Sequence, residues 1–360
     1  MNEPPLSNTQ LAELLAVASE REEEHRARSL RRAAWYALSW DVEAAVLAEQ
    51  GRLTDLRAVG PWVAARIERL LGEPPEVPEP PPLRRGFLSL AEGRRIVAEN
   101  QEVRARLRGD LQMHTTYSDG GASLPEMVEA AQGHGHLYVA VTDHSKGLKI
   151  ARGMDEAGFA RQDREMEALT AELAARGRDI RPLRAIEANL SPQGEPDMDP
   201  TWLEGREIAL GAFHSKLREP DDQTERYLAA IRGGAIDILA HPRGRKFNRR
   251  QGLRADWPRV VAAAAEAGVA VEIDAFPDRQ DLDVGLARLA REAGAWVSLG
   301  TDAHRLEELR FIELAVATVI LADLPPERVL NFLSRDALLE WVAARRSSSR
   351  KRRSRAGGLA

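Results

Sequence analysis

Cysteine is absent from this chain of 360 residues, and long apolar runs are absent as well. Without cysteine there is no disulfide framework and no thiolate metal site, so a bound metal would need imidazole and carboxylate ligands. No apolar stretch of about eighteen residues occurs, and the N-terminus lacks the basic-then-apolar pattern of a signal peptide. We therefore expect a cytoplasmic protein with no membrane partner.

Aromatic residues make up only 5% of the chain, and the formal net charge is −5, which argues against a generally basic coat for nucleic acid. The hydrophobic fraction of 43% supports a real core, and the length suits one large barrel or two ordinary domains. The C-terminal stretch from Arg345 to Arg355 is a dense block of positive charge. Residues 345–360 lack apolar periodicity and are predicted to be a disordered basic tail, which either binds phosphate groups or only aids solubility.

A proline-rich, acidic stretch at residues 73–85 divides the chain and is predicted to be an extended linker. Before it, residues 1–72 show helical patterns, with one amphipathic helix from Leu11 to Val17 and another at 22–37, and are predicted to form a small all-α domain. After it, residues 86–344 are predicted to form a larger domain that begins with a single lead-in helix at 88–107.

Within the first domain, Leu53 to Ile67 shows a short helix, a tight glycine turn and a second helix, and it resembles a helix-hairpin-helix motif. The amides at the start of such a second helix face a DNA phosphate. The resemblance implies DNA contacts from the residues around the turn, namely Val59, Gly60, Trp62 and Arg66. The first of the two usual hairpin glycines is Ala58 here, and we expect Gly60 to hold the positive φ. Two packed helices joined by a tight turn are the alternative.

From residue 110 onward, predicted strands alternate with predicted helices. The strands are expected at 110–114, 138–144, 181–187, 207–214, 236–241, 270–274 and 296–302. This alternation indicates an α/β fold, a parallel barrel in which the catalytic groups lie at the carboxyl ends of the strands. Residues 311–322 are equally compatible with a last barrel helix and with an edge strand.

Five of the eight histidines and three carboxylates fall at these strand ends. The eight candidate ligands are His114, Asp119, His144, Glu187, His214, His241, Asp302 and His304. Imidazole nitrogens and carboxylate oxygens without thiols are typical of hydrolytic centres that hold several zinc, manganese or iron ions. Glu187 is expected to bridge metals because a carboxylate has two oxygens. Asp143 is expected to orient a histidine or cap a loop. His25, His134 and His136 are expected on the surface.

The run from Gly109 to about Val342 resembles a PHP (polymerase and histidinol phosphatase) domain, in the version found at the C-terminus of bacterial family X DNA polymerases. The supporting motifs are Gly109–Gly120, Val141–Gly147, Glu187, His214-Ser215, Leu239–Arg245, Glu272–Arg279 and Thr301–His304. The resemblance implies a distorted seven-stranded barrel with two to three divalent metals. Gln112 stands where the family usually has the first histidine of a His-x-His pair, which implies a labile first metal.

The same resemblance assigns the ligands to three sites. Carried over residue by residue, the first site is His114, Glu187 and Asp302, the second is Asp119, His144 and His304, and the third is Glu187, His214 and His241. Glu187, His241 and Asp302 are implied as the catalytic residues. Substrate phosphate is expected to meet basic residues in the loops that follow the strands, namely Lys146, Arg243, Arg245 and Arg279, with ordinary surface charge as the alternative.

The N-terminal segment is similar to the small helical DNA-binding domain of these polymerases. The interval from Gly72 to Asp110 is too short for a polymerase palm, and the helical domain has no lysine for Schiff-base lyase chemistry. We therefore expect a metal-dependent phosphoesterase that acts as a 3′–5′ exonuclease or 3′-end phosphodiesterase on DNA ends in repair, with DNA repair proteins as partners. The alternatives are a small-molecule phosphatase of the histidinol-phosphatase type and a metal-stabilised scaffold without activity.

Overall fold

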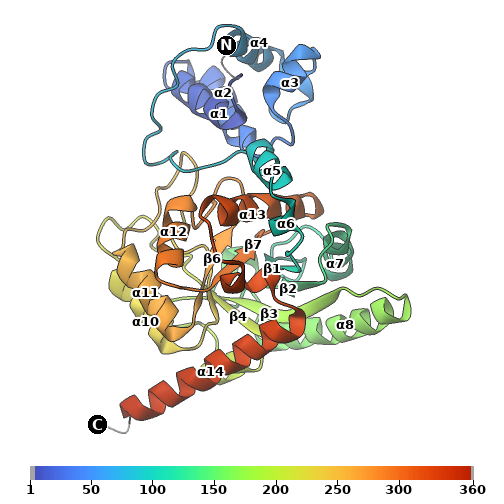
Figure 1. Ribbon diagram of the computed structural model, residues 1–360, viewed down its shortest axis with the longest axis vertical. Helices are drawn as coiled ribbons and strands as arrows, with labels where there is room; N and C mark the ends of the chain where they lie inside the picture. The colour runs from blue at the N-terminus through green and yellow to red at the C-terminus, as the bar shows by residue number, and fades with distance from the viewer. Residues whose placement is uncertain (1–4, 358–360) are drawn as a thin grey trace.

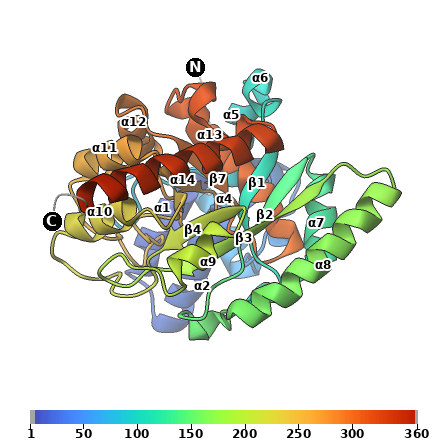
Figure 2. The same cartoon turned by 90° about the horizontal axis from the view of Figure 1, so that it is seen from below.

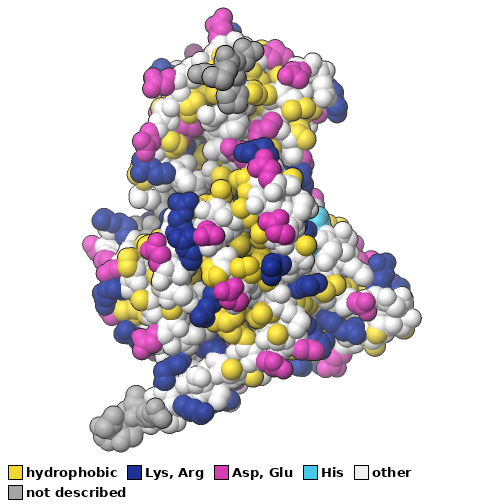
Figure 3. All heavy atoms as spheres, viewed as in Figure 1, with side chains coloured by type: hydrophobic (Ala, Val, Ile, Leu, Met, Phe, Trp, Pro, Cys, Tyr) yellow, Lys and Arg dark blue, Asp and Glu magenta, His cyan; other side chains and the backbone are white. Residues whose placement is uncertain are grey.

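The structure, a computed structural model, describes residues 5–357 and has two lobes (Figure 1). A narrow lobe of short helices lies above a wider lobe built around a sheet, and the same outline is visible in the space-filling view of Figure 3. Among the described residues, no helix is both long enough and apolar enough to cross a membrane.

In its described part, the upper lobe contains four α-helices and one 3-10 turn, which pack around a shared apolar core. They are α1 (Asn8–Ser19), α2 (Glu24–Ala37), α3 (Ala44–Glu49), η1 (Leu53–Asp55) and α4 (Pro61–Gly72). Ser7 begins α1 with a capping box, in which its hydroxyl accepts from the Gln10 amide while the Gln10 side chain accepts from the Ser7 amide. Leu11, Leu30 and Ile67 are fully buried between the helices.

The turn between η1 and α4 corrects one expectation from the sequence. Gly60 has a φ of −88° and is the N-cap of α4, whereas Ala58 has a φ of +68°. The left-handed conformation thus falls on the first hairpin position, where the chain has alanine instead of glycine. The Cβ of Ala58 makes this conformation unfavourable, since only glycine adopts it without steric cost.

No helix or strand is described between α4 and α5 (Leu90–Ala98), and this stretch is bonded to both lobes. Buried Arg84 makes two bonds to the Glu13 carboxylate, of 2.8 and 2.9 Å, and one to Asn248 in the lower lobe. The predicted single helix at 88–107 is wrong, because the chain forms α5 and then a separate short helix, α6 (Gln101–Arg104). Asn100 ends the first helix by donating its side-chain amide to the Ile96 carbonyl.

The lower lobe is a nearly closed barrel of seven parallel strands in sequential order, as predicted. The strands are β1 (Gly109–Met113), β2 (Tyr138–Val141), β3 (Arg181–Asn189), β4 (Ile208–Ala212), β5 (Ile238–Leu239), β6 (Ala270–Asp274) and β7 (Val297–Gly300). The seam between β7 and β1 is bridged by backbone bonds from His114 to Ala303 and from Asp302 to Gln112. Farther down, the Asn331 side chain bonds Gly109 and Leu299 across the same seam.

Helices cover the outside of the barrel (Figures 1 and 2). They are α7 (Leu124–Gly133), α8 (Glu156–Ala175), α9 (Pro200–Glu204), α10 (Thr224–Gly233), α11 (Trp257–Ala267), α12 (Val284–Glu292) and α13 (Ile312–Leu321), together with the short turns η2 (Lys149–Ala151), η3 (Leu306–Phe311), η4 (Pro326–Arg328) and η5 (Leu330–Phe332). Residues 311–322 are therefore mainly helix, so of the two alternatives for this stretch the last barrel helix is correct and the edge strand is not. Apolar side chains of α10 to α13 pack on the outer faces of β5 to β7.

The predicted disordered tail is wrong for the described part of that segment. Helix α14 (Arg335–Gly357) continues through the basic block and lies across the lower end of the barrel (Figure 2). Arg345 and Arg346 are buried because both guanidinium groups contact the carboxylate of Asp237, which is itself fully buried. The high density of positive charge predicted disorder. The two arginines are ordered because they pair with Asp237, a buried carboxylate that is distant in the sequence. Residues 358–360 lie outside the described residues.

Candidate metal centre

Residues near the carboxyl ends of the strands bring the eight predicted ligands together at one mouth of the barrel. His114 directly follows β1, Glu187 lies near the end of β3, and His241 follows β5. The other ligands come from the loops after β1, β2, β4 and β7, namely Asp119, His144, His214, Asp302 and His304. Most are buried, and almost no histidine is visible on the face drawn in Figure 3.

Glu187 lies at the centre of the cluster, and its two carboxylate oxygens face different histidines. Oε1 lies 2.9 Å from His241 Nε2 and 3.0 Å from His214 Nε2. Oε2 lies 3.2 Å from His144 Nδ1 and 3.3 Å from His114 Nε2. Complete burial alone would raise the pKa of Glu187, but the surrounding histidines outweigh burial and hold it well below the usual value. Glu187 is therefore positioned as the predicted bridging carboxylate.

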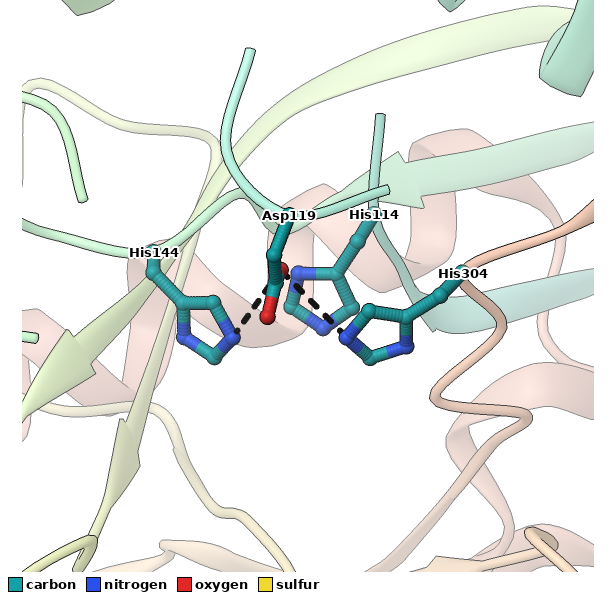
Figure 4. Close-up of side chains that lie close together, drawn as sticks. All are labelled: His114, Asp119, His144 and His304. Atoms are coloured by element: carbon teal, nitrogen blue, oxygen red, sulfur yellow. Dashed lines mark ion pairs between the residues drawn. The ribbon is translucent and has the colours of Figure 1, made fainter. Parts of the chain in front are cut away.

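Asp119 forms a second focus on the more exposed side, where it points at two imidazoles (Figure 4). Its Oδ1 lies 3.3 Å from His304 Nε2 and 3.5 Å from His144 Nε2. Burial opposes ionisation of Asp119, yet these imidazoles and that of His114 lower its pKa to about 2. The same carboxylate, together with Asp302, raises the pKa of His304 to about 9 against the effect of burial.

Asp302 connects the cluster to a cation of the protein. Its Oδ1 lies 3.0 Å from His114 Nε2, and its Oδ2 lies 3.0 Å from the Arg279 guanidinium. Burial alone would raise the pKa of Asp302, but Arg279 and His114 lower it well below the usual range. The carboxylate is therefore ionised and available as a ligand.

Three groups of side chains have ligand atoms within 4.8 Å of one another and fit metal ions. They are His114 with Glu187 and Asp302, His114 with Asp119, His144 and His304, and His144 with Glu187 and His214. The first group coincides with the first predicted site, the second adds His114 to the predicted set, and the third contains His144 where His241 was predicted. Glu187 Oε2 is fully buried and accepts no hydrogen bond among the described residues. Such an oxygen fits a metal better than it fits an apolar interior.

A layer of polar residues behind the ligands fixes their positions. Asp143 accepts bonds from the Thr115 amide and hydroxyl and from Ser118, so it organises the loop after β1, which agrees with the loop-capping role expected for it. Asn189 Oδ1 lies 3.1 Å from His214 Nδ1 and orients that ring. Sequence reasoning missed Asn189, although its position two residues after Glu187 on β3 places both side chains on one face.

Sequence reasoning also assigned no role to Glu272 and Asp274, the fully buried carboxylates of β6. Burial raises the pKa of each well above its usual value, and neighbouring carboxylates raise it further. Glu272 accepts a bond from the His241 amide and so supports the loop that carries this ligand. Gln112 is also buried, and its side-chain amide group has no hydrogen-bond partner among residues 5–357.

The four basic residues expected to bind substrate phosphate have different environments. Arg279 contacts Asp302 and remains partly exposed, so it lies at the centre. Arg243 instead pairs with Asp281 and Asp283. Arg245 has a structural role in place of the expected one, since its buried guanidinium donates to the Gly86 carbonyl in the stretch that joins the lobes. The fourth residue, Lys146, is exposed and pairs with Glu156.

The residues expected to contact DNA lie around the turn that precedes α4. Val59 is buried, Gly60 is exposed, Trp62 is exposed with the Arg26 guanidinium 5.4 Å from its ring, and Arg66 is half-buried. None of these contacts tests DNA binding, which stays a prediction.

Among the three histidines outside the metal centre, His25 is exposed and His134 is half-buried.

His136 was expected on the surface, and this prediction is wrong. The side chain is buried, with an exposed fraction of 2%. Both ring nitrogens lack a hydrogen-bond partner within the described part of the chain. Burial, with a contribution from Arg104, lowers the pKa of His136 to about 3. The ring is therefore neutral in the folded protein.

A nearly closed parallel barrel with buried histidines and carboxylates at its mouth is the arrangement of a metal-dependent hydrolase. Residues 110–274 match the PHP domain family. The chain is 34% identical over 227 residues to DNA polymerase/3′-5′ exonuclease PolX of Bacillus subtilis, an alignment that covers 63% of this chain and 39% of the length of that protein.

It is also 33% identical to a probable phosphatase of Edwardsiella ictaluri, over 64% of this chain and 91% of that protein. A solved histidinol phosphate phosphatase of Lactococcus lactis, complexed with zinc, L-histidinol and phosphate, aligns with 61% of this chain and 94% of its own, with a TM-score of 0.45 and 16% identity. The chain belongs to the PHP domain family and is a metal-dependent phosphoesterase.

Proposed function

We propose that the protein is a 3′–5′ exonuclease or 3′-end phosphodiesterase that acts on DNA ends. The observation that carries the proposal is the position of Glu187, whose two oxygens face separate groups of imidazoles within one buried cluster. The similarity to the Bacillus polymerase and exonuclease, together with the helical lobe beside the barrel mouth, supports DNA as the substrate.

We infer that two or three divalent ions, of zinc, manganese or iron, are held by the three groups of ligands described above. Bound there, they would supply Lewis acidity toward the phosphoryl oxygens and a water of lowered pKa. The ligand imidazoles must be neutral to bind, so protons compete with metal at acidic pH. Arg279 is positioned to donate to a non-bridging phosphoryl oxygen while it keeps Asp302 oriented.

A small-molecule phosphatase of the histidinol-phosphatase type is the second candidate. One observation favours it: the probable phosphatase of Edwardsiella ictaluri is similar over 91% of its own length, which supports a barrel of this kind that works without the helical lobe. This candidate predicts turnover of free phosphate monoesters and no release of nucleotides from DNA.

The test combines metal analysis with digestion of DNA labelled at its 5′ end. We expect the metal-loaded protein to shorten the DNA from the 3′ end and to stop when a chelator is added. Asp302→Asn and His241→Ala should each abolish hydrolysis while circular dichroism shows an intact fold. Full activity of either folded variant would contradict the centre, and hydrolysis of monoesters alone would favour the second candidate.

A further inference from the structure

A groove of about 570 Å³ lies between helix α2 of the upper lobe and the loop at 246–249 in the barrel. Its lining is strongly basic, and none of its lining residues is a carboxylate. The cationic lining residues are Arg28, Arg31, Arg32, Lys246 and Arg249, and two aromatic residues, Trp35 and Tyr36, lie among them. The helix and the loop are far apart in the sequence, so the groove exists only because the two lobes pack together.

Most of this positive charge is not neutralised. Arg28 and Arg31 share a single carboxylate, that of Glu24, at 3.8 and 2.8 Å. Arg32 and Arg249 are exposed and have no ion pair within the part of the chain that the structure describes. The groove therefore has a positive potential that attracts a polyanion, although the whole chain is acidic.

A neighbouring cavity of about 290 Å³ shares the two aromatic residues but has the opposite charge balance. Its charged lining residues are Asp41, Asp55, Glu307, Glu308, Arg57 and Arg310. Four carboxylates against two guanidinium groups repel phosphodiesters. Of these two hollows, a phosphate backbone would thus occupy the basic groove.

Two lining residues of the groove contact the loop after β6, and this loop also carries a residue that contacts the metal centre. Lys246 Nζ and Trp35 Nε1 both contact Asp278 Oδ2, at 3.3 and 2.8 Å. The next residue is Arg279, whose guanidinium lies 3.0 Å from Asp302 in the centre. A strand that follows the groove toward this loop therefore arrives beside a metal-centre carboxylate.

The two walls of the groove are held together by specific contacts. Arg84 bonds Glu13 of the upper lobe and Asn248 of the groove loop with the same guanidinium. Phe247 packs against Phe87 with ring centroids 5.2 Å apart. Because these contacts are buried or half-buried, the groove is formed before any ligand binds.

We propose that this groove binds the phosphate backbone of a single-stranded DNA 3′ end and leads it to the metal centre. The inference rests on the proposed function and deepens it by naming the surface that selects the substrate. A basic groove with aromatic side chains is how proteins hold single strands without sequence preference. Its two walls come from different lobes and carry the cationic and aromatic side chains that such binding requires.

The experiment compares the charge-reversed variant Arg32→Glu/Arg249→Glu with a matched control, Arg106→Glu/Arg164→Glu, whose arginines are exposed elsewhere. Binding of a labelled oligothymidylate with 3′ phosphorothioate linkages to the metal-loaded proteins is measured by anisotropy over a range of salt concentrations. We expect the groove variant to bind about tenfold or more weakly, and the slope of log K against log salt to become less negative by about 1.4, since each lost contact to a single strand contributes about 0.7. The control should match the wild type, and all three should hydrolyse bis(4-nitrophenyl) phosphate equally.

Each alternative result has a distinct meaning. If the wild type degrades DNA but the groove variant binds the oligonucleotide as tightly as the control, the groove inference is overturned and the proposed function stands. If binding depends on the groove but no DNA is hydrolysed, the proposed function fails and the groove remains a single-strand binding surface. Tighter binding of a duplex than of the single strand would also overturn the inference.

Discussion

Arg279 and Asp302 form an ion pair of 3.0 Å at the edge of the metal centre, and the other oxygen of Asp302 faces His114. Both members of the pair are shifted toward their charged forms, since Asp302 raises the pKa of Arg279 and Arg279 lowers the pKa of Asp302. The arginine is also the one predicted phosphate-binding residue that contacts a ligand of the centre. From this position Arg279 orients the carboxylate, and in the function proposed above it would also bind the substrate phosphate.

Replacing Arg279 with glutamine should lower kcat/KM for a phosphodiester by about 30- to 160-fold, because a charge-assisted hydrogen bond is worth about 2–3 kcal/mol. Steady-state rates on bis(4-nitrophenyl) phosphate at several manganese concentrations measure this effect. Lys146→Gln, which removes an exposed lysine paired with Glu156, is the control and should change little. If only the metal concentration for half-maximal rate shifts and KM stays constant, Arg279 positions Asp302 and does not bind substrate.

Removing metal should destabilise the barrel. Glu187, Asp302 and Asp119 are ionised acceptors held close together, and metal binds this arrangement only in the folded chain. At a free metal concentration about one hundred times Kd, one bound ion stabilises the fold by about 2.7 kcal/mol. Calorimetry with and without chelator should show a lower Tm after chelation. This drop in Tm should be smaller in the variant Glu187→Gln than in the control variant Glu340→Gln, which changes an exposed residue. An unchanged Tm in the wild type would argue against bound metal.

Ala58→Gly should stabilise the helical lobe by about 0.5–1 kcal/mol, because the left-handed conformation costs alanine about 1–2 kcal/mol and glycine loses part of that gain in chain entropy. The matched variant, Gly60→Ala, should have an effect near zero, since its φ is −88° and the added methyl group would meet no atom within 4 Å. Urea denaturation measures both changes. A destabilised Gly60→Ala together with a neutral Ala58→Gly would contradict the observed turn.

His136 should make the fold sensitive to acid. Its pKa in the folded protein, about 3, lies below the ordinary value of 6.5, so below pH 6.5 the unfolded chain takes up a proton that the buried ring does not. Stability is therefore lost as the pH falls, by about 1.4 kcal/mol per unit, or about 2 kcal/mol between pH 6.5 and 5. His136→Leu should lack this loss, and unfolding curves at pH 7 and 5 measure the difference. The exposed control is His25→Leu; if its pH profile changes as much as that of His136→Leu, burial is not the cause.

The mouth of the barrel was predictable because parallel strands bring their carboxyl ends together whatever their separation in sequence. His114, Glu187 and Asp302 each lie near a strand end, so their meeting follows from the alternation of strands and helices alone. Asn189 was missed since an amide in a strand has many uses, and only its contact with His214 shows which one applies. Ala58 was misjudged because glycine elsewhere in the turn suggested the wrong position for the positive φ.

Contacts between distant segments could not be predicted in this way. The basic groove pairs helix α2 with a loop of the barrel, and no local pattern indicates that these two surfaces meet. The environment of Arg245 is similar, since a basic residue after a strand end suggested a substrate contact whereas its partner is the carbonyl of Gly86. Periodicity and strand order determine which elements form, but side-chain packing decides which of their polar groups remain available.

Asp237, buried at the lower end of the barrel, also accepts a bond from the Ala209 amide of β4. The last helix, α14, thus covers the end of the barrel opposite the metal centre. Its residues Arg345 and Arg346 neutralise the negative charge of the Asp237 carboxylate, which lies between β4 and β5. Shortening the protein just before Arg345 would leave that carboxylate in an apolar setting without a cation, a change costing several kcal/mol. The first arginines of the basic block therefore stabilise the closed end of the barrel instead of facing solvent.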